Sequence, residues 1–543
     1  MKGGLRASMA WLHTWSGLLV GWVLFLVFCA GTASYFRDEI TVWMKPELHR
    51  ALLAPAVPQA EAADRAVAWL QARAPDSPRW FITLPSAREP MVRVSWAPVP
   101  SSAPAGGRVR FASATLDPAT GAPQADARAT RGGDFFYRLH FDLHYMPPVW
   151  ARWLIGACAM FMLVAILSGI VTHRRIFADF FTFRPKKGQR SWLDAHNATA
   201  VLALPYHLMI TFTGLVTLMF LYVPWGMQAV YGDARDTFLE EVFPSGGPRD
   251  VKRSGDAAPL VPVGPLVAQA QDRWGGAPVG RIAIHQPNDA AATVSLTRQT
   301  GAGTASMSDL APTVRFGGAD GRLQAVSGDP PSATATTRGV LYGLHLGRFA
   351  DPVLRGLFFL SGLAGCLMVA TGLLLWAVKE RQKRAKDVAR GGRAGVGVRL
   401  VDGLNLGAIA GLPIAGAAFF WANRLLPVDV AARADAEIRW FFVAWAAAAV
   451  APPVRPSRRM WQLQLALGGA LFAALPVLNA VTTSTHLGVS LALGLWAVAG
   501  VDGVCGALGL ALLWAAWWVG RRSPRPASPR ARVAVHPAAE GAR

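Results

Sequence analysis

The stretch from Trp192 to Tyr222 reads WLDAHNATAVLALPYHLMITFTGLVTLMFLY, and the interpretation of the whole chain depends on it. It is apolar and long enough to cross a membrane as one helix, and it carries His196 and His207. At about 1.5 Å and about 100° per residue, the two imidazoles lie roughly 16 Å apart along the axis and within about 20° of one face. Ionisable groups inside a bilayer are costly, so the pair predicts a functional site, with a spacing suited to two haems stacked across a membrane.

The composition is that of a polytopic membrane protein. Of 543 residues, 52% are hydrophobic, and several apolar runs exceed the roughly 20 residues that a spanning helix needs. The formal net charge is +21, and the basic residues concentrate in short loops at 173–190, 379–393, 455–459 and 521–532. This distribution follows the positive-inside rule and favours anionic lipid head groups over nucleic acid as the partner.

The cysteines indicate that any haem is held without covalent attachment. The four cysteines all lie in apolar runs, at Cys29, Cys158, Cys366 and Cys505, so the predicted outer segments have no disulfide framework. The chain has no C-x-x-C-H motif, which excludes c-type attachment. It also has no G-x-G-x-x-G or P-loop in a suitable strand–helix context, so electrons would come from a partner or a membrane carrier.

Taken in order, the chain predicts a polytopic α-helical membrane protein with a duplicated four-helix core and a carboxyl-terminal four-helix membrane bundle. The first segment is interpreted as an uncleaved signal anchor rather than a cleaved signal peptide. The predicted parts are span one (1–36), an outer domain (37–146), spans two and three with a basic cytoplasmic loop (147–222), a second outer domain (223–350), span four (351–378), a basic cytoplasmic linker (379–400), the four-span bundle (401–520) and a basic cytoplasmic tail (521–543).

Each outer domain is predicted to hold one helix followed by three strands. The first has a helix at 59–74 and strands at 79–84, 91–97 and 108–115; the second has a helix at 264–274 and strands at 281–286, 292–298 and 313–316. Because each half of the core reads span, small α+β domain, span, and both halves start inside, we expect a parallel repeat.

Two alignments support the repeat and draw attention to small residues. Superposing His13 on His196 also superposes Ala30–Gly31 on Thr213–Gly214, and superposing Ser168–Gly169 on Thr371–Gly372 also superposes Arg152 on Arg355. All four spans therefore carry a small residue followed by glycine. Such pairs let helices pack closely, and they would equally let a flat macrocycle approach the backbone.

Seven histidines lie in or beside the first four spans and form two predicted tiers. In the inner tier His196 is one haem ligand, with His173 as the favoured partner and His13 as the alternative. In the outer tier His207 is expected to pair with His144, His140 or His345. His196 and His207 would then serve different haems.

Other interpretations of the polar residues stay open. His140 and His144 could bind a metal directly at the outer surface, and each histidine could be a core or interfacial group. Polar residues of the last bundle are interpreted as interfacial or interhelical hydrogen-bonding groups: Asp402, Asn405, Asn423, Arg424, Asn479, His486 and Asp502. Three further histidines in polar stretches are expected to be solvated: His49, His285 and His536.

Five stretches resemble the PepSY-associated transmembrane-helix family, often described as iron-regulated inner-membrane proteins. They are WLHTWSGLLVGWVLFLVFCAGTASYFRDEI (11–40), HFDLHYMPPVWARWLIG (140–156), SGIVTHRRIFADFFTFRP (168–185), WLDAHNATAVLALPYHLMITFTGL (192–215) and LHLGRFADPVLRGLFFLSGLAGCLMVATGLLLW (344–376). The resemblance covers about 8–385 and implies two PepSY-like periplasmic domains on a four-helix core. Some members look like haem-containing reductases of ferric siderophores, which supports His13, His144, His173, His196, His207 and His345 as candidate ligands.

The sequence thus predicts a haem b oxidoreductase with two haems in a bacterial inner membrane, both termini being cytoplasmic. Its expected acceptor is ferric siderophore iron in the periplasm, and its donor is a cytoplasmic reductase or a quinol. The alternatives are a PepSY-type regulatory or binding membrane protein, and a siderophore or iron permease, both without redox chemistry. The extra carboxyl-terminal bundle departs from simple family members.

Overall fold

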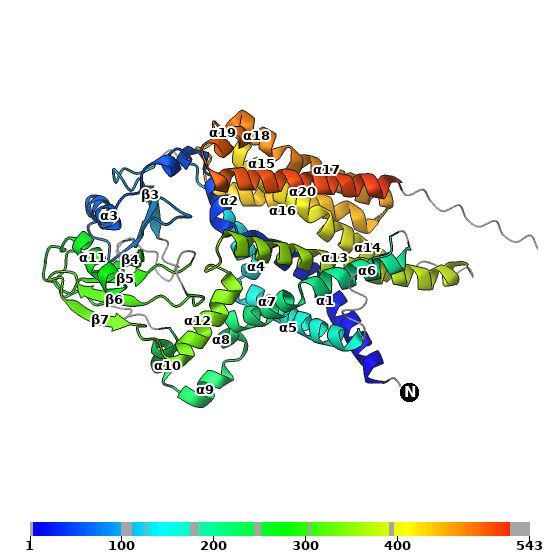
Figure 1. The fold of residues 1–543 in the computed structure, drawn as a ribbon, viewed down its shortest axis with the longest axis horizontal. Coiled ribbons are helices and arrows are strands. Elements are labelled where there is room, and N and C mark those ends of the chain that lie inside the picture. The colour runs from blue at the N-terminus through cyan, green and yellow to red at the C-terminus, as the bar shows by residue number, and fades with distance from the viewer. Residues whose placement is uncertain are drawn as a thin grey trace, which may run out of the picture.

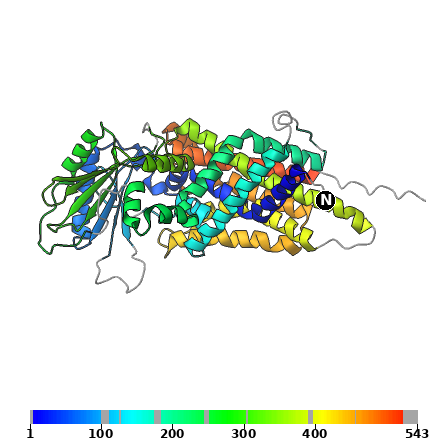
Figure 2. The ribbon, with the colours of Figure 1, turned by 90° about the horizontal axis from the view of Figure 1, so that it is seen from below.

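The computed structural model places a helical bundle beside a β-sheet that lies at one end of it (Figure 1). It describes residues 4–98, 111–124, 127–173, 183–185, 187–243, 251–301, 306–389, 396–454 and 456–521. Seen from below, the molecule is elongated, with the sheet at one end and the long helices running away from it (Figure 2). We call the end of the bundle next to the sheet the sheet end.

Three long helices form the centre of the bundle: α1 (Leu5–Ser34), α5 (Pro148–Thr172) and α13 (Pro352–Ala389). Helix α1 packs against both of the others. The apolar runs that the sequence assigned to spans one, two and four form these helices, and α5 has the bounds that its apolar run predicts for span two, about 148 to 172. Each is long and apolar enough to cross a membrane.

The predicted third span is bent rather than straight. It forms α6 (Gln189–Leu202) and α7 (Leu204–Thr217), which meet at an angle of 68°. Pro205 lies in the first turn of α7, and proline removes a backbone donor and clashes with the preceding turn, so a helix breaks there. The expectation that His196 and His207 share one straight helix face is therefore wrong.

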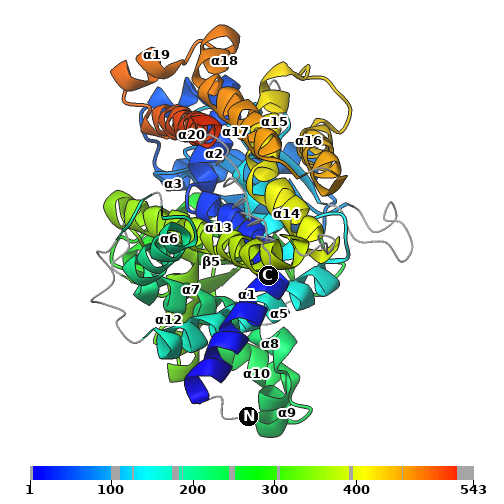
Figure 3. The same ribbon diagram turned by 90° about the vertical axis from the view of Figure 1, so that its right-hand side faces the viewer.

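The carboxyl-terminal bundle gathers on one side of α1 and α13, opposite α5 and α7 (Figure 3). Its helices are α14 (Val396–Ile409), α15 (Gly411–Leu425), α16 (Arg433–Val454), α17 (Arg458–Ala473), α18 (Leu475–Thr482), α19 (Leu487–Ala492) and α20 (Trp496–Arg521). In the described residues, six helical stretches could cross a membrane, with α14 and α15 counted as one stretch and α17 and α18 as another. The number becomes seven if the bent pair of α6 and α7 counts as one span. The eighth expected span falls in α16, which is not among them, and the first turns of α16 carry four charged residues.

A single antiparallel sheet contains the strands of both predicted outer domains. Its strands are β1 (Arg79–Thr83), β2 (Val92–Trp96), β3 (Ala112–Leu116), β4 (Val279–His285), β5 (Thr293–Arg298), β6 (Thr313–Gly317) and β7 (Leu323–Ser327). The order is β3-β2-β1-β4-β5-β6-β7, so β1 and β4 join the two halves. Strand β7 was not predicted, and the start of the third predicted strand, at 108–110, lies outside the described residues.

One hydrophobic core lies on one face of this sheet. Alternate strand residues such as Trp80, Ile82 and Ile282 are fully buried there, as the period-two pattern requires. Helices α3 (Gln59–Arg73) and α11 (Val263–Arg273) add apolar residues to the same cluster and pack on each other (Figure 1). The two expected domains therefore share one sheet and one core.

Short helices connect the sheet to the bundle. They are α2 (Arg37–Trp43), η1 (Pro46–Leu48), η2 (Ala51–Leu53), α4 (Gly133–Asp142), α8 (Met219–Tyr222), α9 (Trp225–Tyr231), α10 (Arg235–Val242) and α12 (Ala333–Leu346). Helix α4 packs on α1, and α12 packs on α7. These two contacts matter because α4 and α12 each bring a histidine against a span.

Buried polar contacts fasten the carboxyl-terminal bundle to α2. The Arg424 guanidinium donates to the carbonyl oxygen of Trp43 at 2.7 Å, and the Trp43 indole donates to Asp502 at 2.8 Å. Asn479 bridges these groups with hydrogen bonds to both charged side chains. The interpretation of these residues as interhelical hydrogen-bonding groups is confirmed. The expectation of a solvated His49 is wrong: its side chain is buried and bonds Thr485 and the carbonyl of Val42.

Candidate functional site

The first histidine pair joins α1 to α6. The ring centres of His13 and His196 lie 6.1 Å apart, with 64° between the ring planes. The Nδ1–H of His13 donates to the carbonyl oxygen of Ala165 on α5 at 2.7 Å, and that of His196 donates to Met368 on α13 at 2.9 Å. Four separate helical segments therefore fix this inner pair, and the ring beside His196 is that of His13, the predicted alternative.

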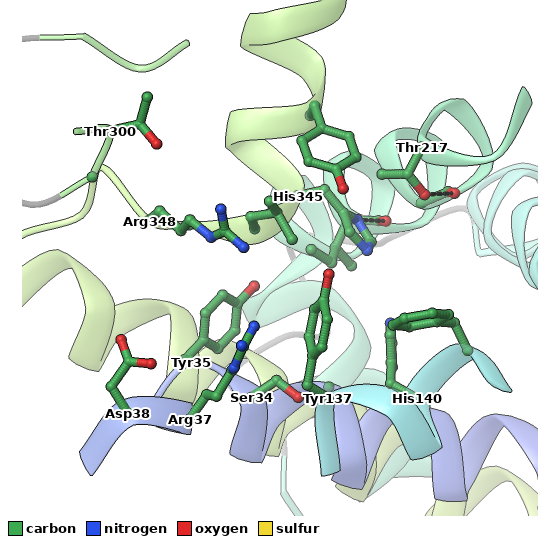
Figure 4. Close-up of a pocket in the computed structure, with 18 of the residues that line it drawn as sticks. Ser34, Tyr35, Arg37, Asp38, Tyr137, His140, Thr217, Thr300, His345 and Arg348 are labelled. Carbon is green, nitrogen blue, oxygen red and sulfur yellow. Dashed lines mark hydrogen bonds between the residues drawn. The ribbon is translucent and has the colours of Figure 1, made fainter. Parts of the chain in front are cut away.

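The second pair lies toward the sheet end and joins α4 to α12. The ring centres of His140 and His345 lie 6.0 Å apart, with 36° between the planes. The Nδ1–H of His140 donates to the carbonyl oxygen of Val27 on α1 at 2.7 Å, and that of His345 donates to Ile210 on α7 at 3.1 Å. Figure 4 shows both imidazoles at the side of a cavity. We call this the outer pair.

The hydrogen bonds fix which ring nitrogen carries the proton. A carbonyl oxygen can only accept, so each Nδ1 must be the donor and each Nε2 holds a lone pair in the neutral ring. None of the four Nε2 atoms makes a hydrogen bond within the part of the chain that the structure describes. Burial and, to a smaller extent, electrostatic repulsion from His140 lower the pKa of His345 to about 3, so this imidazole is neutral at pH 7. All four rings thus present a nitrogen able to bind a metal.

A glycine lies against each of the four imidazoles. A Cβ atom would come within 2.7 Å of the His140 ring at Gly31, 2.9 Å of His345 at Gly214, and 3.1 Å of His13 at Gly169 and of His196 at Gly372. Each of these glycines lies four residues after the carbonyl that accepts from the same histidine. The small-residue pairs singled out in the sequence therefore leave room for imidazoles beside the helix backbone.

His207 belongs to neither pair. It is fully buried on α7, its ring lies edge-on to Phe28 at 6.1 Å, and neither ring nitrogen has a hydrogen-bond partner among the described residues. The predicted pairing of His207 with a histidine of the outer tier is wrong. Helix α7 turns away from α6, and the two outer rings come from α4 and α12 instead.

His173 and His144 also lie outside the pairs. His173 follows the last turn of α5 and its Nε2 lies 3.0 Å from the side-chain nitrogen of Asn197, so it is not the partner of His196. His144 has a φ of +48° just beyond α4 and stacks on Phe442 at 5.6 Å. A direct metal site at His140 and His144 gains no support, since the described residues contain no group of three or more possible ligands.

The outer pair lines a cavity of about 640 Å³ between the spans and the sheet. Span residues such as Val27, Tyr206 and Gly214 line one part, and the strand ends at Thr83, Arg281 and Thr297 line another. Figure 4 shows Tyr35 and Tyr137 in the same space. This volume is typical of small-molecule sites. The residues from the strands could not be predicted as part of this cavity, because only long-range strand pairing brings them here.

Comparison with known proteins identifies the class. Residues 10–379 match the family described as PepSY-associated TM region, so the chain belongs to this family. The matched segment contains both histidine pairs and the whole sheet. An uncharacterized protein of Pseudomonas aeruginosa is 29% identical over 423 residues, an alignment that covers 73% of this chain and 97% of that protein. The chain is thus a multi-pass membrane protein of this family.

Proposed function

We propose that this protein is a haem b membrane oxidoreductase that transfers electrons from the cytoplasmic side of the inner membrane to ferric siderophore iron in the periplasm. The observation that carries the proposal is the presence of two histidine pairs, built alike and lying at successive levels of one helical core. Basic loops at the ends of the spans support an orientation with both termini in the cytoplasm and the sheet in the periplasm.

The residues of both pairs fit a bis-histidine haem. Two imidazoles that bound one metal ion through their Nε2 atoms would have ring centres about 6 Å apart, because each metal–nitrogen bond is about 2 Å long and each ring centre lies about 1 Å beyond its nitrogen. The observed separations are 6.1 Å for the inner pair and 6.0 Å for the outer pair. His13 and His196 would hold one haem, and His140 and His345 the other. When bound, haem supplies reversible one-electron transfer at its iron.

The surrounding residues orient the four imidazoles for this role. A metal-binding histidine commonly donates its second N–H to a carbonyl, which fixes the tautomer and ring orientation. Ala165, Met368, Val27 and Ile210 provide these carbonyls. The glycine beside each ring keeps the side of the helix open.

We further infer that the core is duplicated. His13 and His196 are equivalent in the sequence alignment of the halves. Each of their rings donates a hydrogen bond to the last span of its own half, α5 for His13 and α13 for His196. His140 and His345 both come from the short helix that precedes such a span. One ligand from each half then completes each pair.

The cavity beside the outer pair is the proposed place of the ferric substrate. Its lining from both the spans and the sheet would hold a chelate near His140 and His345. Reduction would release the iron, because hard oxygen ligands suit ferrous iron less well than ferric iron. The electron donor would be a cytoplasmic reductase or a quinol.

A pyridine haemochrome assay of the purified, haem-loaded protein tests the proposal. We expect b-type haem at up to two per chain, and reduction of ferric chelate by vesicle-reconstituted protein when a reductant is supplied on the opposite side. Absence of haem from well-folded protein would overturn the proposal. A regulatory PepSY protein or a siderophore permease would then be the better interpretation.

A further inference from the structure

The cavity beside the outer pair has an excess of arginines. Its charged lining includes six arginines, Arg37, Arg88, Arg93, Arg281, Arg298 and Arg348, against the carboxylates Asp38 and Glu89. They come from α2, from the sheet and from the loops on both sides of it. Figure 4 shows Arg37 and Arg348 extending into the same space beside Tyr35 and Tyr137. The distribution of their partners decides which of them can bind a ligand.

Four of these arginines are neutralised by carboxylates. Arg88 bonds Glu39 at 2.7 Å and Asp38 at 3.1 Å, and Arg348 lies 3.5 Å from Asp309. In the same way, Arg37 pairs with Asp134 and Arg93 pairs with Glu89. These guanidinium groups are committed to the protein's own acids.

The remaining two arginines, Arg298 and Arg281, have no carboxylate partner within the described part of the chain. The Nε of Arg298 is buried without a hydrogen-bond partner among the described residues, and Arg281 lies on the face of β4 that lines the cavity. The Arg281 guanidinium lies over the ring of Phe81, 4.4 Å from the ring centre. The Arg281 side chain is exposed on this face of β4, and no acid among the described residues neutralises its charge. A charge placed in this way is stabilised by an anion that enters the cavity.

The strand register places Arg281 in the middle of a polar row. Thr83 on β1 is paired with Arg93 on β2 and with Arg281 on β4, and Arg281 is paired with Thr297 on β5. Paired residues lie on the same face of a sheet, so all four share one face, the one opposite the fully buried Ile82 and Ile282. All four also line the cavity.

We propose that this row is the binding surface for an anionic ferric chelate, with the Arg281 guanidinium holding a carboxylate or phenolate oxygen of the ligand and Thr83 and Thr297 adding hydroxyl donors. The planar guanidinium suits bidentate binding of such oxygens. The inference rests on the proposed function for the identity of the metal, and it adds that the substrate carries negative charge. A neutral chelate would gain nothing from Arg281.

Binding of redox-inert gallium(III) complexes separates this inference from the electron-transfer proposal. Equilibrium dialysis of the full-length protein would compare anionic gallium(III)–EDTA with neutral gallium(III) tris-acetohydroxamate. We expect tighter binding of the anionic complex, a loss of about tenfold in its affinity in Arg281→Gln, and no change for the neutral complex. Arg322→Gln is the matched control, because Arg322 is 87% exposed and does not line the cavity.

Unchanged binding of gallium(III)–EDTA by Arg281→Gln, or equal affinity of the native protein for the two complexes, would overturn the inference. The elution profile and thermal midpoint of the variant would show that it folds. Because gallium(III) takes no electron, the result is independent of haem loading. Reduction of a neutral ferric chelate without preference for anions would leave the proposed function standing and remove only this inference.

Discussion

The two histidine pairs have the same construction but different surroundings. In both, the rings lie about 6 Å apart, each Nδ1 donates to a helix carbonyl, and a glycine makes room for each ring. The inner pair comes from α1 and α6, both of which belong to the membrane-spanning part. The outer pair comes from α4 and α12, short helices that link the sheet to the spans, and it lines the large cavity. Under the proposed function, electrons would enter at the inner pair and the substrate would lie beside the outer pair.

Removing one pair at a time should have the largest effect. The double variant His13→Ala/His196→Ala should lose about half of the haem and keep the outer spectral component, and His140→Ala/His345→Ala should do the reverse. Each carbonyl that loses its imidazole donor lies inside a helix, where it also accepts a backbone N–H, so the fold should survive. The pyridine haemochrome assay and difference spectra measure both effects.

His207→Ala and His144→Ala are the controls for these variants. Both residues lie outside the pairs, so each variant should keep two haems per chain. If His207→Ala removed half of the haem, the assignment of the outer pair to His140 and His345 would be incorrect.

Filling the glycine positions should give a graded effect. Gly31→Ala places a methyl group 2.7 Å from the His140 ring and should weaken the outer site, at a cost of about 1–3 kcal/mol for the overpacking. Gly372→Ala meets His196 at 3.1 Å and should perturb the inner site less. Haem retention during thermal unfolding is the measurement.

Gly17→Ala on α1 and Gly356→Ala on α13 are matched controls, since a Cβ atom there meets nothing within 4 Å. They should keep native haem retention. Equal losses in Gly31→Ala and in these controls would mean that the glycines serve helix packing in general rather than the imidazoles.

The smallest expected effect concerns two threonine hydroxyls. Thr213 Oγ1 lies 3.2 Å from His345 Nδ1, and Thr371 Oγ1 lies 3.5 Å from His196 Nδ1. Thr213→Val should shift only the outer spectral component and destabilise the outer site by about 1 kcal/mol, and Thr371→Val should change the inner component less. Redox titration followed by absorbance resolves the two. A shift of the inner component by Thr213→Val would contradict the separation of the sites.

Elements with local signals could be predicted from the sequence. Helix α5 has the predicted bounds because Pro148 starts it and a polar run follows it, and α3 and α11 agree within a residue at each end. The alignment of His13 with His196 already contained the inner pair. The short loop between spans two and three pointed instead to His173 as the partner of His196.

The remaining features depend on contacts between distant segments. The outer pair requires α4 to pack on α1 and α12 to pack on α7. The hydrophobic periodicity of the sequence does not indicate either contact. The bend at Pro205 removed the straight-helix argument that made His207 a ligand. The joining of β1 to β4 and the addition of β7 are long-range pairings, and they alone bring Arg281 to the cavity.

Electron paramagnetic resonance of the oxidised, haem-loaded protein tests the central claim most directly. The angle between the imidazole planes is 64° for the inner pair and 36° for the outer pair, so haems held by the two pairs would give different low-spin ferric signals, the more anisotropic one from the pair with the larger angle. We predict two distinct low-spin bis-histidine signals, the more anisotropic one being lost in His13→Ala/His196→Ala and the other in His140→Ala/His345→Ala. A high-spin signal alone, or two low-spin signals that survive both double variants, would contradict the account.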